Sequence, residues 1–126
     1  MRTLTTIVII IVFLLGGSLA SHWYIETMTQ SMEAQLETVE QSVSTQKWEG
    51  AQKELKTAQQ LWDKNKTLWT VLLDHQEIDN IDLSMKRLEK YIVTQEIPLS
   101  LGETAALKLL VDHIYETEEF TLRNIF

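Results

Sequence analysis

The sequence predicts an all-α protein, with an N-terminal transmembrane helix followed by an antiparallel bundle of three to four helices. Three observations predict this fold. Residues 7–15 are an unbroken apolar run, and no charged residue lies between Arg2 and Glu26. Beyond this run, apolar residues recur every three or four positions, which is the period of an α-helix. No segment of any length alternates as a half-buried strand would.

The N-terminal segment, residues 1–25, is predicted to anchor the chain in a membrane. From Leu4 to Trp23 is about 20 residues, or roughly 30 Å of helix, which matches the hydrocarbon thickness of a bilayer. Trp23 and Tyr24 stand where the helix would leave the hydrocarbon, at the interface that their amphipathic rings favour. A cleaved signal peptide is the alternative, because residues 18–20 read small-any-small, as a cleavage site does.

The distribution of charge predicts the orientation of this span. Arg2 lies on its short side, and no Lys or Arg follows on the long side before Lys47. Because Lys and Arg are retained in the cytoplasm, we expect a single-pass protein of the cell membrane with a cytoplasmic N-terminus. Residues 26–126 would then form an extracellular (extracytoplasmic) helical domain.

The composition restricts what this domain can bind. Arg2 is one of 11 basic residues, so 10 remain beyond Ile25 against 18 acidic ones, a formal charge of −8. Phosphate backbones would repel such a domain, and we expect no nucleic-acid partner. The chain has no Cys, so packing alone must stabilise an exported domain.

The apolar spacing divides the domain into helices expected at about 26–43, 45–73, 75–94 and 101–125. The first can continue the membrane span, since no Pro or Gly separates the two. Its apolar face consists of Ile25, Met28, Met32, Leu36, Val39 and Val43. Hydroxyl side chains in residues 42–45 are expected to end this helix and to cap the next one.

The second helix carries a heptad pattern. One row recurs every seven residues and a second row follows three positions later: Trp48, Leu55, Trp62 and Trp69, then Ala51, Ala58, Asn65 and Leu72. Large residues facing small ones let helices interdigitate, so this helix is predicted to be the centre of the core. A ligand groove lined by Trp62 and Trp69 is the alternative. A polar residue in such a seam often fixes register, and we expect Asn65 to hydrogen-bond to His75 or Asp79.

Capping signals predict where the last two helices begin. Asp74 and Glu77 fit a capping box, and Leu73 and Ile78 flank it as a hydrophobic staple. Pro98 forbids continuation of the third helix, and residues 100–103 fit a second capping box at the start of the fourth. The fourth helix is expected to turn five residues inward, namely Leu107, Leu110, Ile114, Thr121 and Ile125.

Few residues are candidates for a catalytic or metal-binding site. His75, Asp79 and His113 are weak candidates for a metal site. The acidic residues at 74–79 have a simpler explanation, because negative charge at a helix N-terminus is favoured by the helix dipole. The sequence contains no nucleophile elbow and no Gly-rich phosphate loop. We therefore expect neither catalytic nor cofactor-binding residues, and no enzyme.

Three motifs taken together resemble a known family. They are Trp-Asp-Lys-Asn-Lys-Thr-Leu-Trp at 62–69, His-Gln-Glu-Ile-Asp at 75–79 and a C-terminal stretch containing Asn124 and Ile125. With the N-terminal span, they resemble the small membrane-anchored helical proteins of Gram-positive, often spore-forming, bacteria described as domain of unknown function 4363. The resemblance implies a single-pass anchor, an extracytoplasmic helical domain and no established activity.

Three classes of function are compatible with these observations. The leading one is a non-catalytic accessory module, held in the lipid bilayer by residues 4–25, that binds a membrane or envelope protein. The second is a structural protein that forms a homodimer through a coiled coil of the helix at 26–43. The third and weakest is a metal-binding sensor or enzyme.

Overall fold

The structure of the protein is a computed structural model. It describes the backbone of residues 1–125 and the side chains of residues 1–114 and 116. The chain folds into five helices: α1 (Arg2–Ser44), α2 (Trp48–Lys64), α3 (Lys66–Leu72), α4 (His75–Val93) and α5 (Ile97–Ile125). The described residues contain no strand, so the all-α prediction is confirmed.

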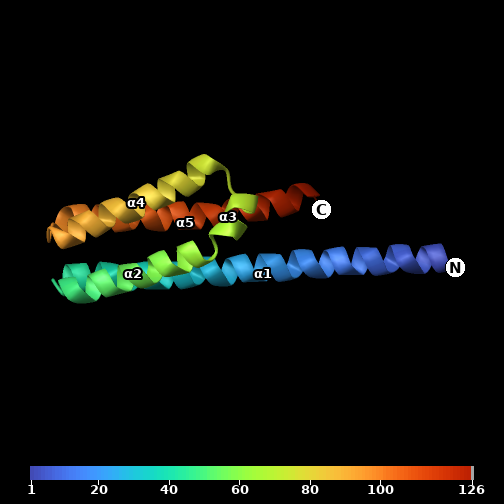
Figure 1. The fold of residues 1–126 in the computed structure, drawn as a ribbon, viewed down its shortest axis with the longest axis horizontal. Helices are drawn as coiled ribbons and strands as arrows, with labels where there is room; N and C mark the ends of the chain where they lie inside the picture. Colours follow the sequence, from blue (N-terminus) through green and yellow to red (C-terminus); the bar gives the residue numbers. More distant parts are fainter. Residues whose placement is uncertain (126) are drawn as a thin grey trace.

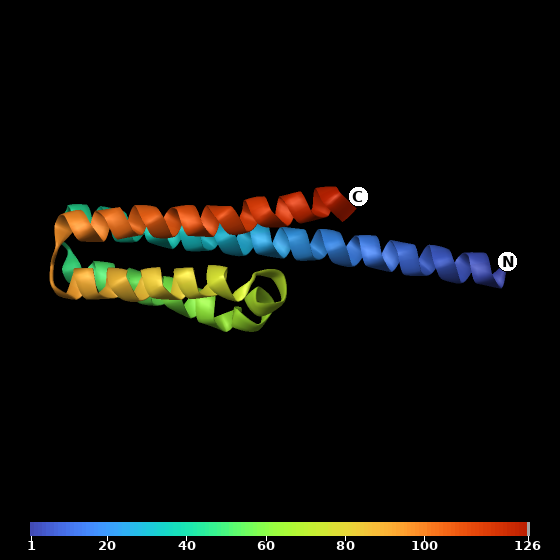
Figure 2. The ribbon, with the colours of Figure 1, turned by 90° about the horizontal axis from the view of Figure 1, so that it is seen from above.

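Four of the helices form an antiparallel bundle with an up-down-up-down course (Figure 1). α1 packs against α2 and α5, and α4 packs against the same two helices from the other side. The α1–α2 and α4–α5 connections lie together at one end, which we call the distal end (Figure 2). Both chain termini and α3 lie toward the opposite end, where α1 projects far beyond the bundle (Figures 1 and 2).

α1 is a single helix of 43 residues with two different halves. Side chains of its N-terminal half are exposed and apolar, including Ile7 through Leu15. From Ile25 onward, one face is buried in the bundle, at the positions that the apolar spacing predicts: Ile25, Met32, Leu36, Val39 and Val43, with Met28 half-buried. The prediction that the first bundle helix continues the apolar segment is therefore confirmed.

The core is one cluster of buried apolar side chains to which all five helices contribute. Burying a large aliphatic or aromatic side chain contributes about 1.5–3 kcal/mol, so this cluster is the main source of stability. Leu55, Trp62 and Trp69 of the first heptad row are buried and Trp48 is half-buried, whereas Leu72 of the second row is 39% exposed. On α5, Leu107 and Ile114 are buried, and Thr121 and Ile125 have side chains outside the described set.

Two predicted boundaries on the second helix are wrong. The helix expected over 45–73 is interrupted at Asn65, whose φ of −108° and ψ of 18° end α2 and begin α3. The hydroxyls in residues 42–45 do not cap α2 either. Its N-cap is Lys47, which forms no side-chain capping bond, and Ser42 instead donates to a Glu54 carboxylate oxygen at 2.8 Å.

The last helix begins four residues before the predicted start. α5 starts at Ile97, and the Ser100 N–H donates to Glu96 O at 3.0 Å as part of its first turn. Pro98 fits there because the first-turn N–H groups of a helix have no intrahelical acceptor, so its missing donor costs little. Ser100 is therefore not a cap. It is fully buried inside the helix, and its hydroxyl has no hydrogen-bond partner among the described atoms.

Candidate functional site

The junction between α2 and α3 is attached to α1 through Asn65. The Tyr24 hydroxyl donates to Asn65 Oδ1, and Asn65 Nδ2 donates to Leu61 O at 2.9 Å. Nδ2 also lies 3.8 Å from the sulfur of Met28. The predicted partners His75 and Asp79 are therefore wrong: the buried amide bonds to the first helix. Sequence reasoning missed this bond because it assigned Tyr24 to a membrane interface alone.

A second polar cluster joins α2 to α4 beside this junction. The Trp62 indole Nε1 donates to one oxygen of Asp82 at 2.7 Å, and Lys66 Nζ pairs with the other oxygen at 2.9 Å. The hydrogen bond to Asp82, with the nearby carboxylates, raises the pKa of Lys66 above its ordinary 10.5. Both oxygens of this carboxylate are thus used within the chain, which makes Asp82 a structural residue rather than a free acid or base.

The two central indoles do not line a groove. Trp62 and Trp69 stack on each other with ring centroids 5.2 Å apart and an interplanar angle of 15°. Both are buried almost completely. The alternative of a ligand groove between them is therefore wrong, because the rings fill the space that a ligand would need.

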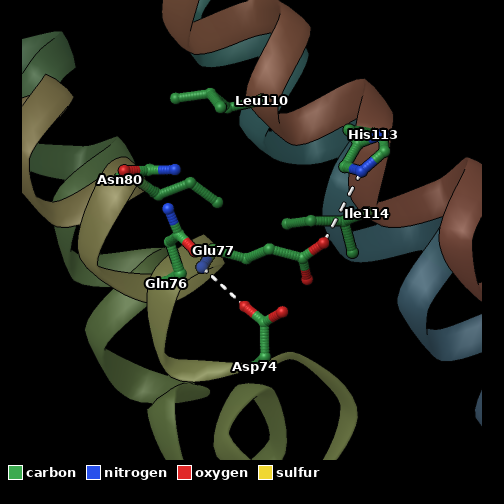
Figure 3. Close-up of a pocket in the computed structure, with 8 residues that line it drawn as sticks. Asp74, Gln76, Glu77, Asn80, Leu110, His113 and Ile114 are labelled. Atoms are coloured by element: carbon green, nitrogen blue, oxygen red, sulfur yellow. Dashed lines mark hydrogen bonds and ion pairs between the residues drawn. The ribbon is translucent and has the colours of Figure 1, made fainter.

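The start of α4 is capped as predicted, with one difference. Asp74 Oδ1 accepts from the Glu77 N–H at 2.9 Å, and the staple residues Leu73 and Ile78 are both buried. In a capping box the Glu77 carboxylate would turn back to the Asp74 N–H. It points across to α5 instead, 3.5 Å from His113 Nε2 (Figure 3).

A shallow groove lies between α4 and α5 at this cap. It has a volume of about 280 Å³, and its lining combines the polar side chains of the α4 N-terminus with three apolar residues, Ile81, Leu110 and Ile114. Figure 3 shows Glu77 and His113 meeting across it. The contact between the Glu77 carboxylate and the His113 imidazole occupies the polar part of this groove, so these side chains have a structural role in joining α4 to α5.

The three weak metal candidates are not brought together. His75 and Asp79 are exposed on α4, whereas His113 of α5 lies beside Glu77. Among the described residues, no group of three His, Cys, Asp or Glu side chains has the geometry to hold a metal ion.

The apolar face of α1 that suggested a homodimer is used inside the chain. Met32, Leu36, Val39 and Val43 are completely buried by α2 and α5. Lys108 of α5 closes the edge of this contact by pairing with Glu37 at 2.7 Å and with Glu40. A coiled coil between two chains would need these same side chains, so this face is not available for it.

Exposed apolar side chains instead lie around α3, on the α2–α4 connection. Val71 is 79% exposed and Leu72 is 39% exposed, and Trp23 of α1 is 67% exposed. The heptad pattern does not predict this surface, because a continuous second helix would place Leu72 in its buried row. Interruption of that helix at Asn65 turns α3 out of line and exposes Val71 and Leu72.

The sequence profile of the family described as Domain of unknown function (DUF4363) matches residues 19–125. The chain belongs to this family. No curated protein sequence and no solved structure matches the chain.

The DUF4363 match includes both halves of the junction described above. It starts at Leu19, so it contains Trp23 and Tyr24 as well as the partner of Tyr24, Asn65. The motif residues Trp62, Asn65 and Trp69 are buried at this junction. Asn124 and Ile125 belong to the last turn of α5, and their side chains lie outside the described set.

Proposed function

We propose that this DUF4363 protein is a non-catalytic accessory module, anchored in the cell membrane by α1, that presents its helical bundle to another membrane or envelope protein. One observation carries the proposal: the same unbroken helix is an exposed apolar rod in its first half and a core helix of the bundle in its second. Within the described chain, α1 is the one helix long and apolar enough to cross a membrane, and none of its apolar window is buried. Contact of this apolar surface with water is unfavourable, whereas the hydrocarbon of a bilayer would bury it.

Continuity of α1 supports a fixed position for the bundle. Residues 16 and 17 are both Gly, yet the helix runs through them from Arg2 to Ser44. A helix crossing the bilayer would therefore hold the bundle directly at the membrane surface, without a flexible linker. Such a module is suited to binding a partner that lies in or on the same membrane, because tethering raises the local concentration of the two.

The charge pattern supports an extracellular bundle. Arg2 precedes the apolar half of α1, and acidic residues from Glu26 onward follow it. A C-terminal fusion to alkaline phosphatase, which folds only outside the cytoplasm, should be active, whereas a C-terminal fusion to a cytosol-dependent fluorescent protein should be dark. The reverse pair of results would contradict this orientation.

Retention of the anchor is tested separately. If α1 remains whole, the protein in the membrane fraction has the full 14.6 kDa mass and resists extraction by high salt or alkaline carbonate. Cleavage after Ala20 would yield a shorter, extractable protein whose first core residue, Ile25, is still present. Intact mass spectrometry distinguishes the two forms. If the shorter form is found, residues 1–20 are a cleaved signal peptide and not an anchor.

The proposed binding activity is tested by photo-crosslinking in living cells. A photoreactive amino acid is placed at the exposed Leu109 of α5 or the exposed Leu83 of α4, with the buried Leu88 as the matched control. A discrete adduct with one other protein from an exposed position, and none from Leu88, is the expected result. Adducts only between copies of this chain would indicate self-association through a face other than the buried face of α1, and the absence of adducts from both exposed positions would contradict the accessory role.

A further inference from the structure

We propose that α3 lies in the headgroup layer of the membrane that α1 crosses, so that the bundle has a second lipid contact through Val71 and Leu72. The ligand of this site is the interface of a phospholipid bilayer. The inference rests on the proposed membrane anchoring and adds to it: the protein would be held by a span and by a surface helix, rather than by a span alone.

The position of α3 along α1 is the first argument. Asn65, the residue immediately before α3, accepts a hydrogen bond from Tyr24 and lies 3.8 Å from Met28 of α1. A span from Leu4 to Trp23 accounts for about 20 residues, or roughly 30 Å, of hydrocarbon. α3 therefore begins level with the residue at which α1 would leave the hydrocarbon, which is the depth of the headgroups.

The direction of α3 is the second argument. It runs across the bundle, whereas α1, α2, α4 and α5 run along it (Figures 1 and 2). If α1 crosses the bilayer roughly along its normal, α3 lies roughly in the membrane plane. This is the orientation that interfacial helices adopt when they bury apolar side chains at the boundary between headgroups and acyl chains.

The division of side chains on α3 is the third argument. Trp69 and the adjoining Leu73 are buried in the bundle, which fixes the inner side of the helix. Val71 and Leu72 are left exposed with no cover from the described part of the chain, and the exposed Trp23 stands on α1 near the same depth. A Trp at this depth is typical of a membrane interface, and lipid would cover all three side chains together.

Lipid is favoured over a protein as the occupant because of where this surface lies. The anchor and the Tyr24–Asn65 bond hold it beside the bilayer whether or not another protein is present.

The experiment uses single-cysteine variants of the full chain, which contains no natural Cys. Val71→Cys is compared with Val93→Cys, a matched valine that is 59% exposed at the distal end of α4. Phe13→Cys, on the exposed apolar half of α1, reports insertion of the anchor. Each variant is labelled with the fluorophore NBD and reconstituted in vesicles of phosphatidylcholine and phosphatidylglycerol, with or without lipids that carry a quenching doxyl group near the headgroup.

We expect the label at position 71 to emit at shorter wavelength than the label at position 93, and to be quenched by the doxyl lipids at least about twofold more strongly, as for an interfacial side chain. Equal quenching at positions 71 and 93, with strongly blue-shifted emission from the label at position 13, would overturn the inference and leave the anchor intact. A blue-shifted label at position 71 without lipid quenching would also overturn it, because protein would then cover the site. Emission from the label at position 13 at the wavelength of a water-exposed label would contradict the membrane anchor itself.

Discussion

Asn65 is the residue at which α2 stops and at which the α2–α3 junction is fastened to α1. Its amide donates to Leu61 O one turn earlier, and side-chain bonds of this kind compete with the backbone pattern of a helix. Its oxygen accepts from Tyr24. A sequence pattern can show that a polar residue interrupts an apolar row, but it does not identify the partner. Tyr24 was not expected as the partner of Asn65, because a Tyr at the end of the apolar segment already fits a membrane interface.

The Tyr24–Asn65 hydrogen bond gives the first prediction. Tyr24→Phe removes the donor and leaves a buried amide oxygen without this partner, so we expect the free energy of unfolding to fall by about 1 kcal/mol. The full chain in detergent, unfolded by urea and followed by circular dichroism, gives this value. Thr27→Val, an exposed change at the next turn of α1, is the control. If Tyr24→Phe and Asn65→Ala were additive in the double variant, the two side chains would not be coupled.

Lys108 gives a prediction about pH. Hydrogen bonds to Glu37, and then to Glu40, raise its pKa above the ordinary 10.5. A Lys whose pKa is raised by folding contributes stability that is fully present below its unfolded-state pKa and is lost as pH rises through the folded-state value. Lys108→Met should therefore be less stable than the natural protein near neutral pH, by no more than about 1 kcal/mol because the pairs are partly solvated. The difference should shrink above pH 10.5, and urea titrations of both proteins measure it.

At the scale of elements, the α1–α2 and α4–α5 connections have the same backbone conformation. Directly after the C-caps of α1 and α4, Thr45 and Thr94, comes a Gln with positive φ, Gln46 at 60° and Gln95 at 57°. In each, the Gln N–H bonds to the carbonyl three residues earlier and the next N–H bonds to the carbonyl five residues earlier, at 2.8–3.0 Å. This is the Schellman motif, in which Gly normally holds the left-handed position because it lacks a Cβ.

Replacing these Gln residues by Gly should therefore stabilise the protein. We expect Gln95→Gly to raise the free energy of unfolding by about 0.5–1 kcal/mol, since the left-handed conformation costs an L-residue about 1–2 kcal/mol and Gly adds some chain entropy on unfolding. Gln52→Gly, at an exposed position inside α2, is the matched control and should lower stability by about 1 kcal/mol. Thermal unfolding of the three proteins compares them, and a loss of stability in Gln95→Gly would contradict the motif.

Element type could be predicted from the sequence more securely than element boundaries. The period of the apolar residues identified α1, α2, α4 and α5 because amphipathic helices must bury one stripe. The cap at Asp74 could also be predicted, since an acidic residue followed by Glu and flanked by apolar residues is a local signal. The starts of α5 and α3 could not. Pro98 is compatible with either a break or a first turn, and the interruption at Asn65 depends on partners in α1.

At the scale of the whole molecule, α1 links anchorage to folding. The helix that would cross the bilayer supplies five completely buried core residues to the bundle, from Ile25 to Val43. Unfolding of the bundle would therefore leave an anchored, acidic, disordered tail at the membrane surface rather than a released domain. The candidate lipid-facing surface is a consequence of the same arrangement, because the site at Val71 exists only where the α2–α3 break meets the exit point of α1. The sequence could predict the anchor and the bundle separately, but not this meeting point.

The final prediction tests whether the α1 face that contains Leu36 is buried within one chain or between two chains. Leu36 is fully buried in the bundle, so Leu36→Ala should lower the free energy of unfolding by about 2–5 kcal/mol through lost burial and the cavity left behind. Leu83→Ala, at a half-exposed position of α4, should change it by less than about 0.5 kcal/mol. Because Leu36 packs within one chain, its effect should be independent of protein concentration. A homodimer formed through this face would instead make the stability of the natural protein fall on dilution, and the loss in Leu36→Ala would then vary with concentration. Urea unfolding of both variants over a dilution series in detergent distinguishes the two cases.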